Sequence, residues 1–255
     1  MRRVPHDCRF ALVKPAARRP RLVSLPLLFL LLLSAHSQAP ADDFTEAQQR
    51  TAARRMVEVI QDYGMTDPEI LGIMETVPRH RFVPEENRKY SYHDTPLGIG
   101  YGQTISQPFI VAEMTRQLHL SPTSKVLEVG TGSGYQAAVL AEITPQVYSI
   151  EIIEALHERA GRTLAENGYQ SVRLRHGDGY YGWPEAAPFD GIIVTCAAGH
   201  IPPPLIEQLA VGGRMIIPVG KRFGTQHLIL VTKNPDRTIT STNLMAVRFV
   251  PLVRQ

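Results

Sequence analysis

Cysteine and tryptophan are scarce in this sequence of 255 residues, which contains two cysteines and one tryptophan. Cys8 lies near the start and Cys196 in the body, so no intramolecular disulfide remains if the leading stretch is removed. The nine histidines form no H-x-x-x-H pair and no cluster with cysteine, and we therefore expect no metal site. Cys196 follows the strand-like residues 192–195 and is predicted to be a buried structural thiol.

Long apolar runs are also missing, with one exception near the start. Basic residues precede the apolar run 25–33 and small residues, 39–41, follow it, which is the layout of a secretory signal. The run is too short for a comfortable membrane span. We predict that residues 1–41 are a signal-like leader, disordered or cleaved. A mis-assigned start codon is the alternative, because the basic part is unusually long.

A basic body is missing as well. Residues 1–41 hold seven basic residues and one acidic residue, a net charge of +6, whereas the whole chain carries only +3. Residues 42–255 therefore carry −3 and show no basic stripe of the kind that nucleic-acid binding needs. We expect no nucleic-acid partner and, apart from the leader, no stable membrane partner.

The first part of the body reads as helices followed by a loop. Helical spacing of apolar residues predicts helices over 42–63, 67–77 and 108–120, the second with Asp67 as its cap and Pro68 in its first turn. Residues 79–107 have many turn formers and little periodicity. Their aromatic residues indicate an ordered loop packed over something, and we take this loop as a candidate lid.

From Lys125 onward, strands and helices alternate. Strands are predicted at 125–130, 146–151, 172–176 and 190–195, with helices at 134–143, 152–167 and 203–210. Further strands are predicted at 215–219, 228–232 and 243–250, separated by turns at 212–213, 220–224 and 234–236. This order indicates a doubly wound, Rossmann-like α/β sheet, mostly parallel with antiparallel C-terminal strands and with helices on both faces. We expect one domain over 42–255, with N-terminal helices and an active-site loop (42–120) before the core (121–255).

The first buried strand of this core ends in a glycine turn. Gly130, Gly132 and Gly134 alternate, and a predicted helix follows. The dinucleotide fingerprint is G-x-G-x-x-G, and Tyr135 stands where its last glycine belongs. A strand, a turn without side chains and a helix N-terminus favour a nucleotide-like ligand, and the alternative is a tight turn with no ligand.

The next two strand ends narrow the choice of ligand. Glu151 ends the second strand, where an acidic residue accepts hydrogen bonds from two ribose hydroxyls. Asp178 and Gly179 follow the third strand, where Asp178 could receive an adenine amino group or its backbone could frame the ring. These ends fit an adenosine-bearing ligand without a diphosphate, for which S-adenosylmethionine is the obvious candidate. The alternatives are a solvated charge at Glu151 and a simple turn at Asp178.

Five sequence blocks carry a resemblance to a known family. They are Gly102-Gln103-Thr104-Ile105-Ser106-Gln107-Pro108, residues 127–135, 177–193 and 212–220, and Phe249-Val250-Pro251-Leu252. Together, over roughly residues 45–252, they resemble the protein-L-isoaspartate O-methyltransferase family. That resemblance implies methylation of the isoaspartyl carboxylate in damaged proteins and peptides by S-adenosylmethionine. The ester then collapses to a succinimide, which can reopen as normal aspartate.

The same resemblance implies roles for particular residues. Ser106 would be the catalytic residue and touch the substrate carboxylate, with Val250 and Pro251 lying along the substrate peptide. The cofactor would be held by Thr104, Gly130, Gly132, Gly134, Glu151, Asp178 and Gly179. Because a carboxylate is ionised at neutral pH, the reaction needs no general base, and Ser106 would act by orienting an oxygen. The alternative role for Ser106 is a helix cap before Pro108.

Other interpretations stay open. One is a related methyltransferase for a small molecule or RNA; against RNA, Thr195-Cys196-Ala197-Ala198 stands where a base-modifying enzyme has Asn-Pro-Pro-aromatic. Another is a non-catalytic cofactor-binding protein of the same fold. We expect a monomer in the cytoplasm, from family habit and cofactor supply, with export through the leader as the alternative. The leader and the short stretch after Leu252 depart from the family pattern, since longer members use that tail to cover the cofactor.

Overall fold

The computed structural model describes residues 45–221 and 224–254. The predicted leader (1–41), the first three residues of the predicted first helix and two residues of the predicted turn at 220–224 lie outside the described residues. Among the helices of the described part, none is both long and apolar enough to cross a membrane.

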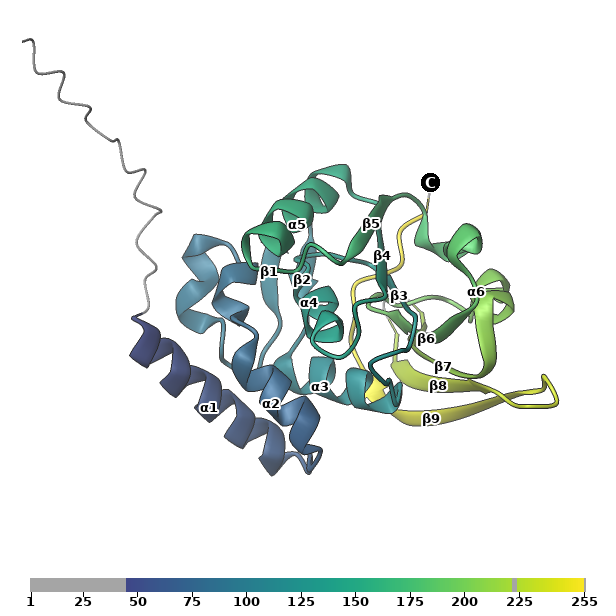
Figure 1. Cartoon of the computed structure of the whole chain (residues 1–255), viewed down its shortest axis with the longest axis horizontal. Helices are drawn as coiled ribbons and strands as arrows, with labels where there is room; N and C mark the ends of the chain where they lie inside the picture. Colours follow the sequence, from purple (N-terminus) through teal and green to yellow (C-terminus); the bar gives the residue numbers. More distant parts are fainter. Residues whose placement is uncertain (1–44, 222–223, 255) are drawn as a thin grey trace, which may run out of the picture. The chain divides into compact units, whose positions relative to one another are not determined.

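A seven-stranded sheet runs through the described residues (Figure 1). In spatial order its strands are β5 (Arg173–His176), β4 (Val147–Glu151), β3 (Val126–Val129), β6 (Phe189–Val194), β7 (Leu209–Gly220), β8 (Gln226–Lys233) and β9 (Ile239–Val247). Neighbouring strands from β5 to β7 pair in parallel, whereas β8 and β9 pair antiparallel. The predicted fold class is confirmed. The winding direction reverses at β3, and in such sheets ligands bind outside the carboxyl ends of the strands at this switch point.

Helices cover both faces of the sheet (Figure 1). Val126, Ile193 and Ile216 belong to a core shared with α3 (Pro108–Gln117), α4 (Tyr135–Ala141) and α5 (Glu154–Glu166). Their sequence neighbours Leu127, Ile192 and Met215 point to the other face and share a core with α6 (Pro203–Gln208). Since successive side chains of a strand point to opposite faces, these continuous apolar runs bury both sides of the parallel strands.

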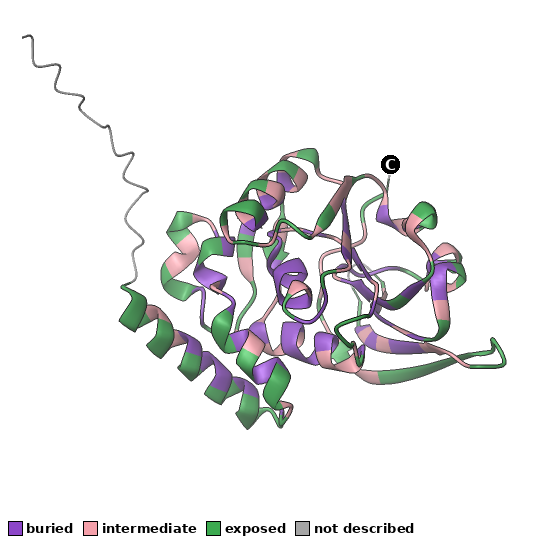
Figure 2. Ribbon diagram, viewed as in Figure 1, coloured by how far each residue is buried: buried purple, intermediate pink, exposed green. Residues whose placement is uncertain are grey.

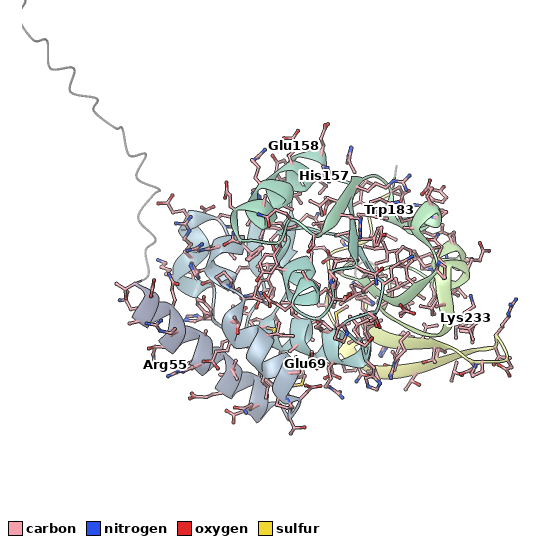
Figure 3. All side chains as sticks on the ribbon, in the orientation of Figure 1. Arg55, Glu69, His157, Glu158, Trp183 and Lys233 are labelled. Carbon is pink, nitrogen blue, oxygen red and sulfur yellow. The ribbon has the colours of Figure 1, made fainter. Side chains whose placement is uncertain are left out.

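The second face is completed by two short 3₁₀ helices, η3 (Gly179–Tyr181) and η4 (Pro184–Ala186). Between them Trp183 packs edge-on against Tyr148, with ring centres 5.4 Å apart. Lys233 donates hydrogen bonds to the carbonyls of Ile206 and Leu209 and so satisfies the C-terminal end of α6 (3.0 and 2.8 Å). Trp183 and Lys233 are labelled in Figure 3.

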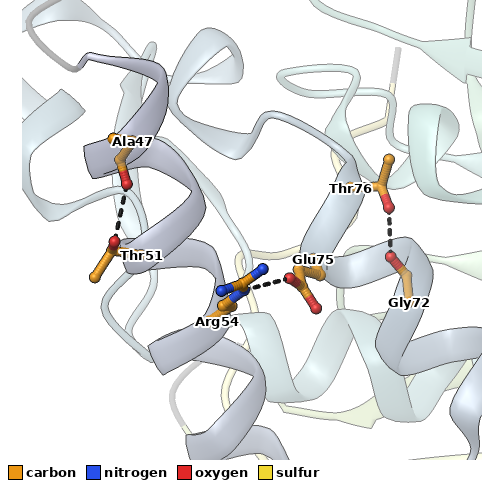
Figure 4. Close-up of polar contacts among 6 residues, drawn as sticks. All are labelled: Ala47, Thr51, Arg54, Gly72, Glu75 and Thr76. Atoms are coloured by element: carbon orange, nitrogen blue, oxygen red, sulfur yellow. Dashed lines mark hydrogen bonds and ion pairs between the residues drawn. The ribbon is translucent and has the colours of Figure 1, made fainter.

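Two N-terminal helices pack beside this core, and their ends follow local sequence signals. α1 (Glu46–Asp62) begins with a capping box between Thr45 and Gln48, and α2 (Pro68–Thr76) begins at the predicted cap Asp67. An exposed ion pair, Arg54 to Glu75 (3.1 Å), links the two helices (Figure 4). Exposed pairs stabilise little, so the buried apolar face of α1 holds it in place, while its outer face is exposed (Figure 2).

The segment 79–107 is ordered and packed as predicted, but the interpretation of it as a loop without regular elements was wrong. The segment contains the 3₁₀ helices η1 (Arg79–Phe82) and η2 (Glu85–Tyr90) and a hairpin of β1 (Leu97–Gly100) and β2 (Gln103–Ile105). Each of these elements is too short for its residues to show a helical or strand periodicity in the sequence. The hairpin tip also needs positive φ angles at Gly100, Tyr101 and Gly102 (88°, 54° and 70°), which glycine adopts readily and tyrosine does not.

Two C-terminal strands differ from their predicted bounds. β7 runs through the predicted turn at 212–213, where a Cβ on Gly213 would lie 2.9 Å from the Ala210 carbonyl oxygen and 3.0 Å from that of Asp190. Glycine there permits a close approach of two backbones instead of a turn. β9 begins four residues before the predicted start and ends at Val247. Residues 239–243 lie exposed at the edge of the sheet and all but Ile239 are polar, so no apolar alternation marks the start of the strand.

Candidate active site

The glycine turn after β3 brings backbone close to the ends of two other strands. The N–H groups of Gly130 and Thr131 donate to the Ile150 carbonyl (2.8 and 3.2 Å). Gly130 has φ of 99°, and a Cβ there would lie 2.5 Å from Thr195 Oγ1. At Gly134 a Cβ would instead meet Leu164 of α5 at 3.1 Å. Gly130 therefore allows the Thr195 side chain, just after β6, to lie close to the turn, whereas Gly134 allows α4 and α5 to pack closely.

Glu151, at the end of β4, is buried and bound to backbone on both oxygens. Gly132 N–H donates to Oε2 (2.8 Å) and Ile153 N–H donates to Oε1 (2.9 Å). Each carboxylate oxygen has a second lone pair, so the side chain is held rigidly and can still accept two hydroxyl donors. This is the donor and acceptor arrangement that a ribose diol needs.

A hollow of about 530 Å³ opens at the ends of β3, β4 and β6. Seven of the predicted site residues line it: Thr104, Gly130, Gly132, Glu151, Gly179, Val250 and Pro251. Gly179 forms its wall against Val129, where a Cβ would overlap the valine side chain. We call this space the cofactor hollow.

Asp178 lies beside the cofactor hollow and not in its lining. Its Oδ1 accepts the Tyr180 N–H (3.0 Å) and its Oδ2 accepts Arg254 Nε (2.8 Å), while the Arg254 guanidinium carbon lies 3.6 Å from the centre of the Tyr180 ring. Residues 250–254 form a strap, which is also hydrogen-bonded to both sides of Ala197 (2.8 Å each). Asp178 thus fastens a strap that covers the hollow.

A second hollow, of about 970 Å³, adjoins the first and contains Ser106. Its other wall is the backbone and side chains of residues 246–250. Thr104, Thr195 and Val250 line both hollows. We call the second space the substrate hollow, and its boundary with the cofactor hollow is the place where two bound molecules would meet.

Ser106 is not the cap of α3. The capping position is Gln107, which makes no side-chain cap, and the Phe109 N–H is accepted by Asp94 Oδ1 from a distant segment (2.8 Å). The alternative interpretation of Ser106 as a helix cap is therefore wrong. Among the hydrogen bonds between described residues, none uses the Ser106 hydroxyl, which leaves it able to donate to a bound carboxylate.

Glu128 is a buried acid that was not among the site residues predicted from the sequence. It lies on β3, accepts a hydrogen bond from Ser149, and lines a small chamber together with Ser106. Burial, with the nearby charge of Glu151, raises the pKa of Glu128 to about 8, although the Ser149 hydrogen bond opposes this. Glu128 therefore holds its proton at neutral pH. An acid within an apolar strand was the signal in the sequence that could have found it.

Two further expectations from the sequence concern Cys196 and a metal site. Cys196 is buried as predicted, and burial raises the pKa of its thiol. Within residues 45–221 and 224–254, no group of three or more histidine, cysteine or acidic side chains is placed to hold a metal ion.

Comparison with known proteins agrees with this geometry. Residues 51–255 match the family model described as Protein-L-isoaspartate(D-aspartate) O-methyltransferase (PCMT). The chain belongs to this family. It is 53% identical over 234 residues to Protein-L-isoaspartate O-methyltransferase 2 of Syntrophobacter fumaroxidans, covering 89% of this chain and 95% of that protein. It is also 53% identical over 231 residues to the Protein-L-isoaspartate O-methyltransferase of Opitutus terrae, covering 91% and 97%.

Solved structures of family members share the fold. A Plasmodium falciparum structure described as a putative protein-L-isoaspartate O-methyltransferase, in complex with S-adenosyl-L-homocysteine, superposes with a TM-score of 0.70 at 27% identity, over 80% of this chain and 99% of that one. A second structure, of a protein-L-isoaspartate O-methyltransferase, gives a TM-score of 0.71 at 30% identity, over 78% and 65%. The predicted family is thus confirmed by sequence and by fold.

Proposed function

We propose that this protein is an S-adenosylmethionine-dependent methyltransferase that esterifies the isoaspartyl carboxylate of damaged proteins and peptides. One observation carries the proposal: the cofactor hollow and the substrate hollow meet at Thr104, Thr195 and Val250, beside the unengaged hydroxyl of Ser106. Membership in the family and the relatives named above support the choice of reaction.

The residues of the cofactor hollow fit the proposed cofactor. Glu151 offers two fixed acceptors for the ribose, and the glycine positions keep the floor free of side chains. When bound, S-adenosylmethionine supplies a methyl group on a positively charged sulfur, which a carboxylate oxygen takes up while the sulfur keeps the electron pair of the broken C–S bond. No proton is transferred, so the site needs no general base.

The substrate hollow would hold the peptide against residues 246–250. The Ser106 hydroxyl would donate to one carboxylate oxygen and leave the other aligned with the cofactor hollow. Such positioning can supply roughly 7–11 kcal/mol of a barrier. We infer that Val250 contacts both the peptide and the cofactor, because it lines both hollows, whereas Pro251, which was predicted to lie along the peptide, lines the cofactor hollow and not the substrate hollow.

The test is methyl transfer to matched peptides. Purified protein is incubated with labelled S-adenosylmethionine and two peptides that differ only in isoaspartate against aspartate. Transfer confined to the isoaspartyl peptide is expected. Cofactor binding without transfer to either peptide would instead favour a non-catalytic binding protein, and transfer to RNA or a small molecule would favour the other alternative.

Ser106→Ala should lower kcat roughly 10- to 100-fold and change the Kd for S-adenosylhomocysteine by less than about threefold, because only orientation of the carboxylate is lost. Steady-state kinetics and calorimetric titration measure the two quantities. Ser241→Ala, on the exposed part of β9, is the matched control and should change neither. Equal losses in turnover and cofactor affinity would contradict the role given to Ser106.

We further propose that the protein acts as a monomer in the cytoplasm, where its cofactor is made. N-terminal sequencing of the native protein checks the location, since retention of residues 1–41 is expected. Removal of these residues from a protein recovered outside the cytoplasm would favour export, whereas their absence from a cytoplasmic protein would favour the mis-assigned start codon.

A further inference from the structure

Arg79 is a fully buried cation that binds the backbone of the proposed reacting residue. It is the first residue of η1, and its side chain has no exposed area. Its Nη2 donates to the Ser106 carbonyl (2.6 Å) and its Nε donates to the Ser91 carbonyl (2.7 Å). The three residues come from separate parts of the chain, 12 and 27 positions apart.

The same guanidinium group also touches the glycine motif. Its central carbon lies 4.7 Å from the ring centre of Tyr135, the first residue of α4 after the glycine turn. Arg79 therefore contacts the segment that carries Ser106 and the segment that forms the floor of the cofactor hollow. A planar fork with several fixed donors can make these contacts together, whereas a lysine ammonium cannot.

The positive charge of Arg79 is buried without a carboxylate partner among the described residues. Among the described residues no carboxylate lies within ion-pair distance of Arg79, and burial lowers the pKa of its guanidinium while Tyr135 and the more distant charge of Asp94 raise it. Burying an incompletely paired cation costs free energy that an apolar side chain would not. A contribution to stability therefore does not account for the buried Arg79 side chain, whereas its hydrogen bonds to the Ser91 and Ser106 carbonyls do.

Asp94 holds the same segment from the other side. It accepts the Phe109 N–H (2.8 Å) and the Gln107 side-chain amide (2.6 Å). Before Ser106, the backbone is paired in the hairpin, with Thr104 opposite Gly98 and Ile105 opposite Leu97. The hydrogen bond from Arg79 to the Ser106 carbonyl is a further contact that holds residues 104–109 in place. It fixes the plane of the peptide group between the hairpin and α3, and this plane determines the direction of the Ser106 side chain.

We propose that Arg79 is a positioning residue for methyl transfer, which fixes the backbone of Ser106 relative to the glycine turn. The inference rests on the proposed function for its kinetic part. Arg79 acts through Ser106 and contacts neither the proposed cofactor nor the proposed peptide, because Arg79 lines neither hollow.

The test is a double-mutant cycle between Arg79→Lys and Ser106→Ala. Alone, Arg79→Lys should lower kcat for the isoaspartyl peptide roughly 10- to 100-fold, as expected for a misplaced group, and change the Kd for S-adenosylhomocysteine less than about threefold. In the Ser106→Ala background it should cost less than about threefold more, because the group it positions is gone. Losses that multiply, or a parallel loss of cofactor affinity, would overturn the proposal.

A second measurement does not depend on activity. In Arg79→Lys and in Arg79→Gln, amide hydrogen exchange in the segment 106–109, measured at residues 106, 107 and 109 because Pro108 has no amide hydrogen, should be roughly tenfold faster, while exchange in α1 stays unchanged. Ile60→Ala, a buried change in α1, is the control for general loosening, and it should lower the melting temperature without altering exchange at 106–109. If the wild-type protein transfers no methyl group, the proposed function fails and exchange alone decides the role of Arg79. Unchanged exchange at 106–109, or failure of both Arg79 variants to fold, would assign Arg79 to stability alone and overturn the proposal.

Discussion

Glu151→Gln should weaken the binding of S-adenosylhomocysteine about 100-fold. The carboxylate accepts the N–H groups of Gly132 and Ile153 in a buried position, and its remaining lone pairs face the cofactor hollow. An amide can accept with its oxygen only, so its NH₂ group would face one of the two N–H donors and could not accept a ribose hydroxyl. Charge-assisted hydrogen bonds are worth about 1.5–3 kcal/mol each, and losing one accounts for the expected effect.

Calorimetric titration measures this change, and Glu142→Gln is the matched control. Glu142 follows α4 and accepts a hydrogen bond from the Tyr169 hydroxyl at the surface (2.8 Å), away from both hollows. The same chemical substitution there should leave the Kd within about twofold. An unchanged Kd in Glu151→Gln would mean that the ribose is bound elsewhere.

Glu128→Gln should stabilise the protein increasingly as the pH rises from 5 to 8. The folded protein holds the Glu128 proton up to a pKa of about 8, whereas the unfolded chain releases it near the ordinary value of 4.5. Between these values the folded state binds more protons, so raising the pH favours unfolding by about 1.4 kcal/mol per pH unit. A neutral amide avoids this cost, and by pH 8 the difference should be on the order of 4 kcal/mol.

Denaturant unfolding of the wild type and the variant at pH 5, 6, 7 and 8 checks this dependence. The two free energies of unfolding should nearly coincide at pH 5 and separate steadily above it. Glu185→Gln is the control, because a backbone hydrogen bond and the ion pair with Arg175 (2.9 Å) lower the pKa of its exposed carboxylate, so that it changes protonation only below this range. Parallel curves for the wild type and Glu128→Gln would show that Glu128 is ionised in the folded protein.

The parts of the site that the sequence predicted are those made by neighbouring residues. The turn at Gly130 and Gly132 follows its own strand, and Glu151 follows the next, so the rule that ligands bind at carboxyl ends of parallel strands was enough to bring them together. Ser106 came from the resemblance of its segment to a family and not from any spacing. Gly134 and Asp178 were grouped with the cofactor residues, but the structure places one against Leu164 and the other against Arg254.

The residues that sequence reasoning missed act over long distances in the chain. Thr195 lies at the end of a predicted strand, and the strand-end rule could have found it. No local pattern marks Arg79, because its partners are carbonyl groups that every residue has. Asp94 likewise replaces the expected cap of α3 from 15 residues away.

The sequence by itself determined the order of strands and helices from Lys125 onward, the helix cap at Asp67, and the glycine turn at the end of the first buried strand. These features depend on interactions between residues a few positions apart, so the local pattern contains them. Only the tertiary structure decided that the Ser106 hydroxyl is free, that Arg79 holds its carbonyl over a separation of 27 residues, and that Arg254 fastens the strap to Asp178 over 76. Such contacts depend on which strand ends meet at one edge of the sheet, and the hairpin and strap reach that edge through packing that no local repeat encodes.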